Sequence, residues 1–393
     1  MTSGSKHLPV ELRTERMATG GEAVARLDDG RVVFVLGALA DETVRVEIVE
    51  EKKRFARGVV IDVVEPSPHR VAPSCSHAVS GECGGCDWMH IRPDEQRSYK
   101  EAVVVEQLQR LGGVERPDVV SPVFQRGRRT TVRCQVTHGR AGYRARRSDQ
   151  SFVADECGAV DSRLEELLVN GRFGDATEIT LRIGGATGER MVITNGAVDM
   201  VLVPDDVLVA SADDPASSAI HDVVAGKTWR VSARSFFQTS HAGAEALVAA
   251  VARRLGQSEG SVLDLYSGVG LLGGGAAGDR LRCAVESNPS SVDDARHNLG
   301  PDVQVVQSRV ERWSPTTFST VIADPARRGL GKDGVSVLEG TSASRLVLVS
   351  CDPASLGRDT GLLAERGWVH EGSEVLDMFP DTSRIEVASS FTR

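Results

Sequence analysis

From residue 226 onward, the chain alternates short apolar segments with helical patterns, and this alternation constrains the fold more than any other feature. The predicted strands cover residues 261–265, 282–286, 303–307, 320–323 and 346–350. Helical patterns, such as those over 241–255 and 291–299, lie between them. Strands that alternate with helices build a doubly wound parallel sheet. Two last strands, 374–377 and 384–391, predict an antiparallel hairpin at its edge.

The remaining sequence divides into two further regions. Residues 8–63 hold four or five β-like runs separated by glycine turns, and Asp29-Gly30 is a hairpin signal between two of them. So many strands in so short a segment predict a small barrel of the OB type. After a proline-rich linker, residues 69–225 mix a helix near 94–111 with several strands. We therefore predict domains at 1–65, 66–225 and 226–393.

A glycine loop follows the first strand of the C-terminal domain. Gly268-x-Gly270 lets the backbone approach a ligand closely, and Glu286 ends the next strand. An acid at that position can accept hydrogen bonds from both hydroxyls of a ribose. Loop, acid and strand order together predict a nucleotide-containing cofactor, and NAD and S-adenosylmethionine both suit this geometry. A tight turn beside a surface glutamate is the structural alternative.

Three side chains in or next to the later strands carry reactive groups. Cys351 follows a strand and precedes Asp352-Pro353, where a helix is expected to start. A helix N-terminus stabilises a thiolate, and substrates bind at this sheet edge, so Cys351 is our candidate nucleophile. Glu386 could accept a proton, and Pro325 aims Asp324 into the cleft. For each residue taken alone, a packed thiol, an exposed glutamate or an ordinary turn is the default interpretation.

Three cysteines within one short segment predict a metal site. Cys75, Cys83 and Cys86 are spaced x7 and x2, Gly84-Gly85 forms the bend, and Cys157 offers a distant fourth thiol. Four thiolates suit zinc or a four-iron cluster. The distant fourth ligand and the lack of a second Cys-x2-Cys pair favour [4Fe–4S] over zinc.

Charge and cysteine content indicate which partners the chain could contact and in which compartment it would work. The net charge is −9, yet eight arginines and no acid lie between residues 126 and 147, and a second basic run covers 52–57. Such patches fit phosphate contact, and a solvated strand face is the alternative. No apolar run is long enough for a membrane span, and the start lacks a signal-peptide pattern. An odd count of seven cysteines predicts a reducing cytoplasm. No obligate protein partner is evident.

With these residues in place, the chain resembles the RNA uracil-5 methyltransferase family along nearly its whole length. Residues 8–63 resemble the family's RNA-binding TRAM domain. Ser235-Phe236-Phe237-Gln238 is similar to a Phe-Phe-Gln segment that contacts S-adenosylmethionine, and Asp324 matches an Asp-Pro-Pro-Arg motif. Residues 350–353 resemble the nucleophile motif Ser-Cys-Asn-Pro, and residues 376–386 resemble the C-terminal signature that ends in a catalytic glutamate.

The resemblance implies a class I (Rossmann-like) methyltransferase domain with an N-terminal OB-like TRAM barrel and a mixed α/β central domain. It makes Cys351 the nucleophile and Glu386 the base of uracil C5 methylation. It assigns the S-adenosylmethionine site to Gln238, Tyr266, Gly268, Gly270, Glu286 and Asp324. Cys75, Cys83, Cys86 and Cys157 fall where the family's ribosomal-RNA branch holds a four-iron cluster.

The expected partner is therefore RNA, with 23S ribosomal RNA favoured over transfer RNA. The chain departs from the family pattern at several positions: Ala326 replaces a proline, Asp352 an asparagine and Arg384 a histidine. These departures leave open a catalytically inactive RNA-binding assembly factor. An NAD-linked oxidoreductase that uses the glycine loop is a third alternative.

Overall fold

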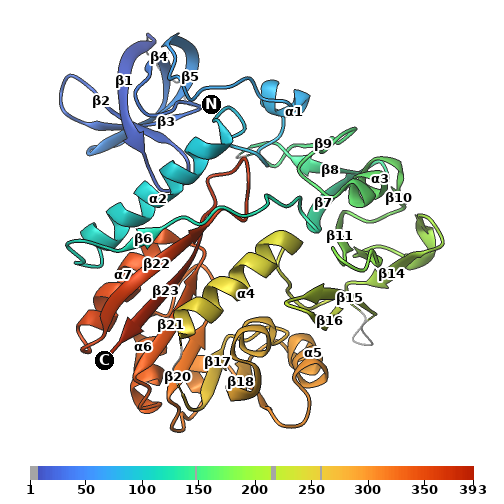
Figure 1. Ribbon diagram of the computed structural model, residues 1–393. Coiled ribbons are helices and arrows are strands. Elements are labelled where there is room, and N and C mark those ends of the chain that lie inside the picture. Colours follow the sequence, from blue (N-terminus) through green and yellow to red (C-terminus); the bar gives the residue numbers. More distant parts are fainter. Residues whose placement is uncertain (1–7, 147, 214–217, 257–258) are drawn as a thin grey trace.

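The computed structural model describes residues 8–146, 148–213, 218–256 and 259–393. Its N-terminal part is a closed barrel of five strands in the order β1-β2-β3-β5-β4, at the top of Figure 1. Small and β-branched side chains such as Ala25 and Val33 are fully buried in its interior. The strands are β1 Val10–Met17, β2 Ala23–Arg26, β3 Val32–Leu36, β4 Thr43–Glu51 and β5 Phe55–Glu65. The predicted small barrel is confirmed.

The C-terminal part contains an eight-stranded sheet in the order β19-β18-β17-β20-β21-β23-β22-β6. The first five strands are parallel, and β23 pairs antiparallel with β21 and β22. The bounds are β17 Val262–Leu265, β18 Leu281–Glu286, β19 Gln304–Gln307, β20 Thr320–Ala323, β21 Arg345–Ser350, β22 Val369–Leu376 and β23 Glu386–Thr392. This is the predicted doubly wound sheet with its antiparallel hairpin.

Helices cover both faces of this sheet, and polar residues fix where three of the four begin. Ser240, Asn288 and Asp352 each cap a helix by accepting a hydrogen bond from a backbone N–H in its first turn. The helices are α4 His241–Leu255, α5 Pro289–Leu299, α6 Gly331–Gly340 and α7 Pro353–Ala364. None of the helices in the described ranges combines the length and apolarity needed to cross a membrane.

The central region has a sheet of its own, six strands in the order β14-β12-β11-β7-β8-β9. Helix α3, Ser162–Asn170, packs on this sheet and closes a separate apolar core. The strands are β7 Thr131–Thr137, β8 Arg140–Arg144, β9 Ser151–Val153, β11 Glu178–Ile183, β12 Arg190–Thr194 and β14 Val207–Ser211. Smaller elements are α1 Ser76–Val79, β10 Arg172–Phe173, β13 Val201–Leu202, β15 Ala219–Val224 and β16 Lys227–Ser232.

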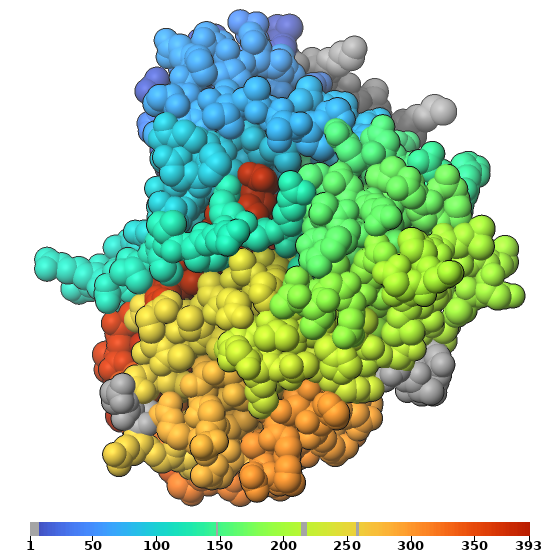
Figure 2. Space-filling model, turned by 45° about the vertical axis from the view of Figure 1, so that its right-hand side comes forward, coloured from blue at the N-terminus to red at the C-terminus, as the bar shows by residue number. Residues whose placement is uncertain are grey.

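One part of the central region joins the C-terminal sheet instead, which the sequence did not predict. Helix α2, Pro93–Arg110, packs on α7, and β6, Val119–Val120, adds a parallel strand beside β22. One apolar cluster runs from the barrel through Trp88 and α2 to one face of the sheet. In Figure 2, red C-terminal residues surface between the blue-to-teal N-terminal third and the green and yellow segments. The three regions therefore converge above the sheet's carboxyl edge (Figure 1).

Candidate active site

A cavity of about 590 Å³ opens at the carboxyl edge of the parallel strands. This is the edge where open α/β sheets bind their ligands. The lining includes every catalytic and cofactor-binding residue predicted from the sequence: Gln238, Tyr266, Gly268, Glu286, Asp324, Cys351 and Glu386, with the exception of Gly270. Gly270 lies one turn behind the wall, where an added Cβ would come within 2.8 Å of Leu299 Cγ.

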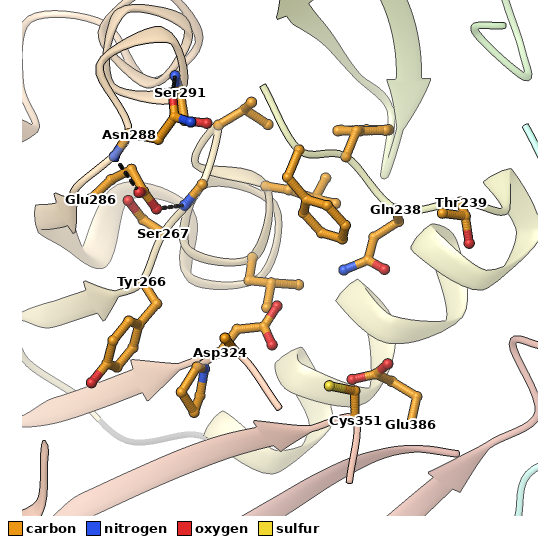
Figure 3. Close-up of a pocket in the computed structure, with 18 of the residues that line it drawn as sticks. Gln238, Thr239, Tyr266, Ser267, Glu286, Asn288, Ser291, Asp324, Cys351 and Glu386 are labelled. Carbon is orange, nitrogen blue, oxygen red and sulfur yellow. Dashed lines mark hydrogen bonds between the residues drawn. The ribbon is translucent and has the colours of Figure 1, made fainter. Parts of the chain in front are cut away.

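The glycine loop holds Glu286 in a fixed position. The Gly268 N–H donates to Glu286 Oε2 at 3.0 Å. The N–H groups of Ser287 and Asn288 donate to Oε1 at 2.6 and 2.7 Å (Figure 3). Three backbone donors therefore orient one carboxylate at the cavity wall. Oε2 keeps a second lone pair, so Glu286 can still accept a hydroxyl of a ribose.

Two polar residues that the sequence analysis did not select also line the cavity. Asp264 is fully buried in β17, and its Oδ2 accepts the Gly273 N–H at 2.9 Å. Its Oδ1 and the Ser267 hydroxyl are buried without a hydrogen-bond partner. Burial raises the pKa of Asp264 to about 8. Such groups suit a cationic or hydrogen-bonding ligand. The signal in the sequence was an acid inside the apolar strand directly before the glycine loop.

The local backbone explains why the run of glycines after the loop is required. Residues Gly273–Ala277 form a single π-helical turn rather than a regular α-helix. A Cβ on Gly273 would lie 2.6 Å from Asp264 Oδ2, so only glycine lets its N–H reach the carboxylate. Gly273, within this π-helical turn, therefore positions a cavity-lining acid.

The antiparallel register brings Cys351 and Glu386 together from distant parts of the sequence. Ser350 pairs with Val387 across β21 and β23, so the next residue on β21 lies opposite Glu386. Figure 3 shows the Cys351 sulfur beside the Glu386 carboxylate, with Asp324 facing both. Cys351 immediately follows β21 and precedes Asp352, the N-cap of α7. A thiol and a carboxyl group thus share one wall of the cavity.

Burial raises the pKa of all three groups, Glu386, Asp324 and Cys351. Burial is the main cause of the raised pKa of Glu386, and the charge of Asp324 adds to it. Burial likewise raises the pKa of Asp324. The Cys351 thiol has its pKa raised to about 11, first by burial and then by the two carboxyl groups, while Arg327 lowers it. Titratable groups perturbed this strongly in a cavity are typical of catalytic sites.

Gln238 enters the cavity from the opposite side. It is 8% exposed and lies between the β15–β16 hairpin and the Ser240 cap of α4. Its side-chain amide points toward the space between Asp324 and Cys351 (Figure 3). An amide offers both a donor and an acceptor, so Gln238 can orient a polar ring or a cofactor there.

Three arginines, Arg234, Arg327 and Arg384, line the cavity and expose their side chains. Within the described ranges, none of them forms an ion pair with an acid, so they give the opening a positive charge. The arginine run of 126–147 differs from our expectation of a free basic patch. Several of its members are neutralised by acids, including Arg126 by Asp377 and Arg133 by Glu178. Arg147 lies outside the described residues.

The four cysteines predicted to bind metal are free and half-buried. They lie close enough for their charges to interact: burial raises the pKa of Cys83, and the neighbouring thiols of Cys157 and Cys75 raise it further. The guanidinium of Arg129 lies 3.9 Å from the Cys86 sulfur. In the described part of the chain, however, no three or more His, Cys, Asp or Glu residues are arranged to hold a metal ion. Cys134 and Cys283, which belong neither to this cluster nor to the cavity, are buried.

Comparisons with known proteins agree with this architecture. Residues 10–61 match the TRAM domain family. An uncharacterized RNA methyltransferase of Streptomyces coelicolor is 33% identical, over 96% of this chain and 91% of the relative. The 23S rRNA (uracil(1939)-C(5))-methyltransferase RlmD of Alkalilimnicola ehrlichii is 28% identical, over 98% of this chain and 97% of that protein.

Among solved structures, the Pyrococcus abyssi tRNA (uracil-54, C5)-methyltransferase in complex with S-adenosyl-L-homocysteine has the same fold. The TM-score is 0.74 at 24% identity, and the match covers 99% of this chain and 100% of that one. The arrangement of a TRAM barrel with an α/β methyltransferase domain, predicted from the sequence, is therefore confirmed.

Proposed function

This chain belongs to the RNA methyltransferase family, and on that basis we propose that it methylates C5 of a uracil in RNA, using S-adenosylmethionine. The observation that carries the proposal is the Cys351–Glu386 pair, which shares one cavity with a glycine loop and its acid. Transfer of a methyl group to an exposed amino nitrogen would need no thiol. The RlmD relative, whose name specifies uracil C5, supports the same chemistry.

The proposed reaction requires both side chains in turn. Uracil C5 is a poor nucleophile, and addition of the Cys351 thiolate to C6 converts the C5=C6 double bond into an enolate centred on C5. That carbon would take the methyl group as the methyl–sulfur bond breaks and S-adenosylhomocysteine leaves, so that C5 becomes tetrahedral and carries both the methyl group and its original proton. Glu386 then removes the C5 proton, the C–H electrons restore the double bond, and the thiolate leaves C6. Atoms and charge balance without any other reagent.

The cofactor site proposed from the resemblance fits the residues that the structure brings together. Glu286 would hold the ribose, and Gln238, Tyr266, Gly268 and Asp324 would complete the lining of the site. Gly270, which the resemblance also assigns to the site, would act through the shape of the glycine loop, where its φ is +89°. Asp264 Oδ1 and the Ser267 hydroxyl, which have no partner, offer further contacts for polar groups. When bound, S-adenosylmethionine supplies the methyl group and a positive sulfonium charge, which favours the ionised forms of nearby acids.

Large-subunit ribosomal RNA is the substrate that we propose. The RlmD relative is named for 23S rRNA, and the TRAM match supports RNA contact. Transfer RNA is the alternative. Unstacked bases in single-stranded loops are the expected targets, because the base must enter the cavity. Mapping 5-methyluridine in ribosomal and transfer RNA from cells with and without the gene separates the two substrates. If neither RNA pool changed, both substrate proposals would be refuted.

We also propose a cytoplasmic location, consistent with seven free cysteines.

Two other functions make different predictions. An inactive RNA-binding assembly factor would bind RNA without consuming S-adenosylmethionine. An NAD-linked oxidoreductase would bind NAD more tightly than S-adenosylmethionine in a calorimetric titration. Incubation of purified protein with ribosomal RNA fragments and labelled S-adenosylmethionine tests all three. We expect 5-methyluridine by nucleoside mass spectrometry, and RNA binding without product would favour the assembly factor.

We further propose that Cys75, Cys83, Cys86 and Cys157 hold a [4Fe–4S] cluster, with zinc as the alternative. Four free, half-buried thiols whose charges interact form a suitable set of donors, although the side chains would have to converge to bind one. Anaerobically purified protein should absorb in the visible range, and Cys83→Ser should remove that absorption. A colourless protein containing zinc would refute the iron–sulfur assignment. No step of the methylation passes through this site.

A further inference from the structure

The loop that follows Asp324 is attached to helix α7 by a buried carboxylate with no role in the mechanism above. Asp359, on α7, is 2% exposed. Its Oδ2 accepts the Leu330 N–H at 2.7 Å, and its Oδ1 accepts the Gly331 N–H at 3.0 Å. Both oxygens of one side chain thus bind the far end of residues 325–331, which we call the acid loop.

The acid loop wraps closely around this carboxylate. Gly329 has a φ of +75°, and a Cβ there would lie 2.1 Å from Asp359 Oδ2. Nearer the start of the loop, the Ser355 hydroxyl donates to the Arg327 carbonyl at 2.6 Å. Asp359 and Ser355 lie one helical turn apart on α7, so one face of a single helix anchors two points of the loop.

The same helix also determines the position of the nucleophile. Cys351 directly precedes Asp352, whose side chain caps α7 by accepting the Ser355 N–H at 2.7 Å. Arg327 and Cys351 both line the cavity. The positive charge of Arg327 lowers the pKa of the Cys351 thiol against the larger effect of burial. Helix α7 therefore begins just after the thiol and holds the loop that carries Arg327, which with Arg384 is one of two arginines whose charges interact with that thiol.

We propose that Asp359 is a positioning residue that, together with Ser355, holds the acid loop so that Arg327 stays beside Cys351. This inference rests on the proposed function, in which Cys351 must act as a thiolate. Asp359 itself touches neither the thiol nor the cavity. A role limited to folding would lower stability and leave the thiol unchanged.

The test measures the acidity of the thiol directly. Trypsin releases Cys351 on the peptide of residues 346–358, in which it is the only cysteine. Mass spectrometry of this peptide can therefore follow the alkylation of Cys351 by iodoacetamide separately from that of the other cysteines. Asp359→Asn keeps the shape but places an NH₂ group against a backbone N–H, and Ser355→Ala removes the second anchor. We expect each variant to raise the apparent pKa of Cys351 by up to about one unit, the size of a lost opposite charge, and to slow alkylation by up to about tenfold.

A matched control separates this effect from general damage to the helix. Thr360 is buried on α7 and its hydroxyl bonds only to the Leu356 carbonyl of its own helix. Thr360→Ala should lower stability and leave the alkylation profile unchanged. Asp359→Asn should also lower kcat while the dissociation constant for S-adenosylhomocysteine stays near that of the wild type. Alkylation profiles of Asp359→Asn and Ser355→Ala that match the wild type, in folded protein, would overturn the proposal.

Failure of the proposed function would appear differently. If Cys351→Ala retained methyltransferase activity, the assignment of Cys351 as the nucleophile would be refuted. This would hold even if Asp359→Asn shifted the alkylation profile of Cys351. If Cys351 proved essential and the profile did not shift, only the positioning role would be refuted.

Discussion

Asp87 accepts two hydrogen bonds from Ser383, at 2.9 Å from its backbone N–H and 2.6 Å from its hydroxyl, although the two residues lie 296 positions apart. Asp87 follows Cys86 of the cysteine cluster, and Ser383 lies just before Arg384 and Glu386. The barrel closes over the same point, because a Cβ on Gly21 would lie 2.6 Å from Ser383 Cβ. All three regions of the chain therefore meet within a few residues of the candidate base.

Removing this contact should loosen the loop that leads to Glu386. Asp87→Ala leaves the half-buried Ser383 N–H without its partner, a cost of about 1 kcal/mol. We expect a lower free energy of unfolding in urea and a lower kcat. Ser383→Ala keeps the backbone bond and should have a smaller effect on both. Equal effects of the two variants, or a fall in stability without any loss of kcat, would contradict this coupling.

Glu286 should control cofactor affinity. Glu286→Ala removes a carboxylate that would accept ribose hydroxyls, and hydrogen bonds to a charged group contribute about 1.5–3 kcal/mol, or roughly tenfold to hundredfold in affinity. Calorimetric titration with S-adenosylhomocysteine measures this loss. Asp293→Asn is the control, because it removes a nearby acid of α5 that pairs only with Arg296. Unchanged affinity in Glu286→Ala would show that the ribose lies elsewhere.

The catalytic carboxyl should reduce the stability of the empty enzyme as pH rises. The pKa of Glu386 is raised in the fold, so the folded state keeps a proton that the unfolded chain releases above about pH 4.5. Stability is therefore lost as pH increases, and Glu386→Gln avoids that loss. We expect the variant to be more stable than the wild type by about 1–3 kcal/mol near pH 8, and by less near pH 5. A variant that is less stable near pH 8 would contradict the burial argument.

The three cavity arginines should appear in the salt dependence of RNA binding. Each phosphate contact made by single-stranded RNA contributes about −0.7 to the slope of log K against log salt. Arg384→Gln and Arg234→Gln should each reduce the slope by about that amount. Arg282→Gln, at the opposite end of β18, should not. Slopes identical to the wild type in both cavity variants would mean that the RNA does not cross this opening.

The sequence predicted the C-terminal sheet well because each buried strand is a short apolar run and helices α4, α5 and α7 each have a start signal. Asp352-Pro353 and Asn288-Pro289 predict the starts of α7 and α5, because they provide the N-cap and the first residue of each helix. The pairing of Cys351 with Glu386 could be inferred only through the family resemblance, because it depends on the register of two strands. The boundaries proposed near residues 65 and 225 remain predictions.

The contacts between regions could not be predicted from local patterns. Lys100 looks like an ordinary helix-surface residue, yet it is fully buried and donates to Asp377 Oδ1 at 2.6 Å and to the Phe379 carbonyl. The sequence pattern also did not predict Asp264 as a cavity residue, since an acid inside an apolar strand gives no periodic signal. The partners of Lys100 lie 277 and 279 positions away in the sequence, so only the folded chain shows these contacts.

The central claim is that the Cys351 sulfur bonds to C6 of the target uracil, and RNA that carries 5-fluorouridine tests it most directly. Fluorine at C5 leaves no proton for Glu386 to remove, so the adduct should persist after methyl transfer. We predict a covalent protein–RNA complex that requires S-adenosylmethionine, maps to the peptide of residues 346–358 and is absent in Cys351→Ala; Glu386→Gln should accumulate the corresponding adduct on ordinary RNA. Turnover by Cys351→Ala, or a wild-type enzyme that methylates RNA yet forms no adduct with the fluorinated substrate, would contradict the account.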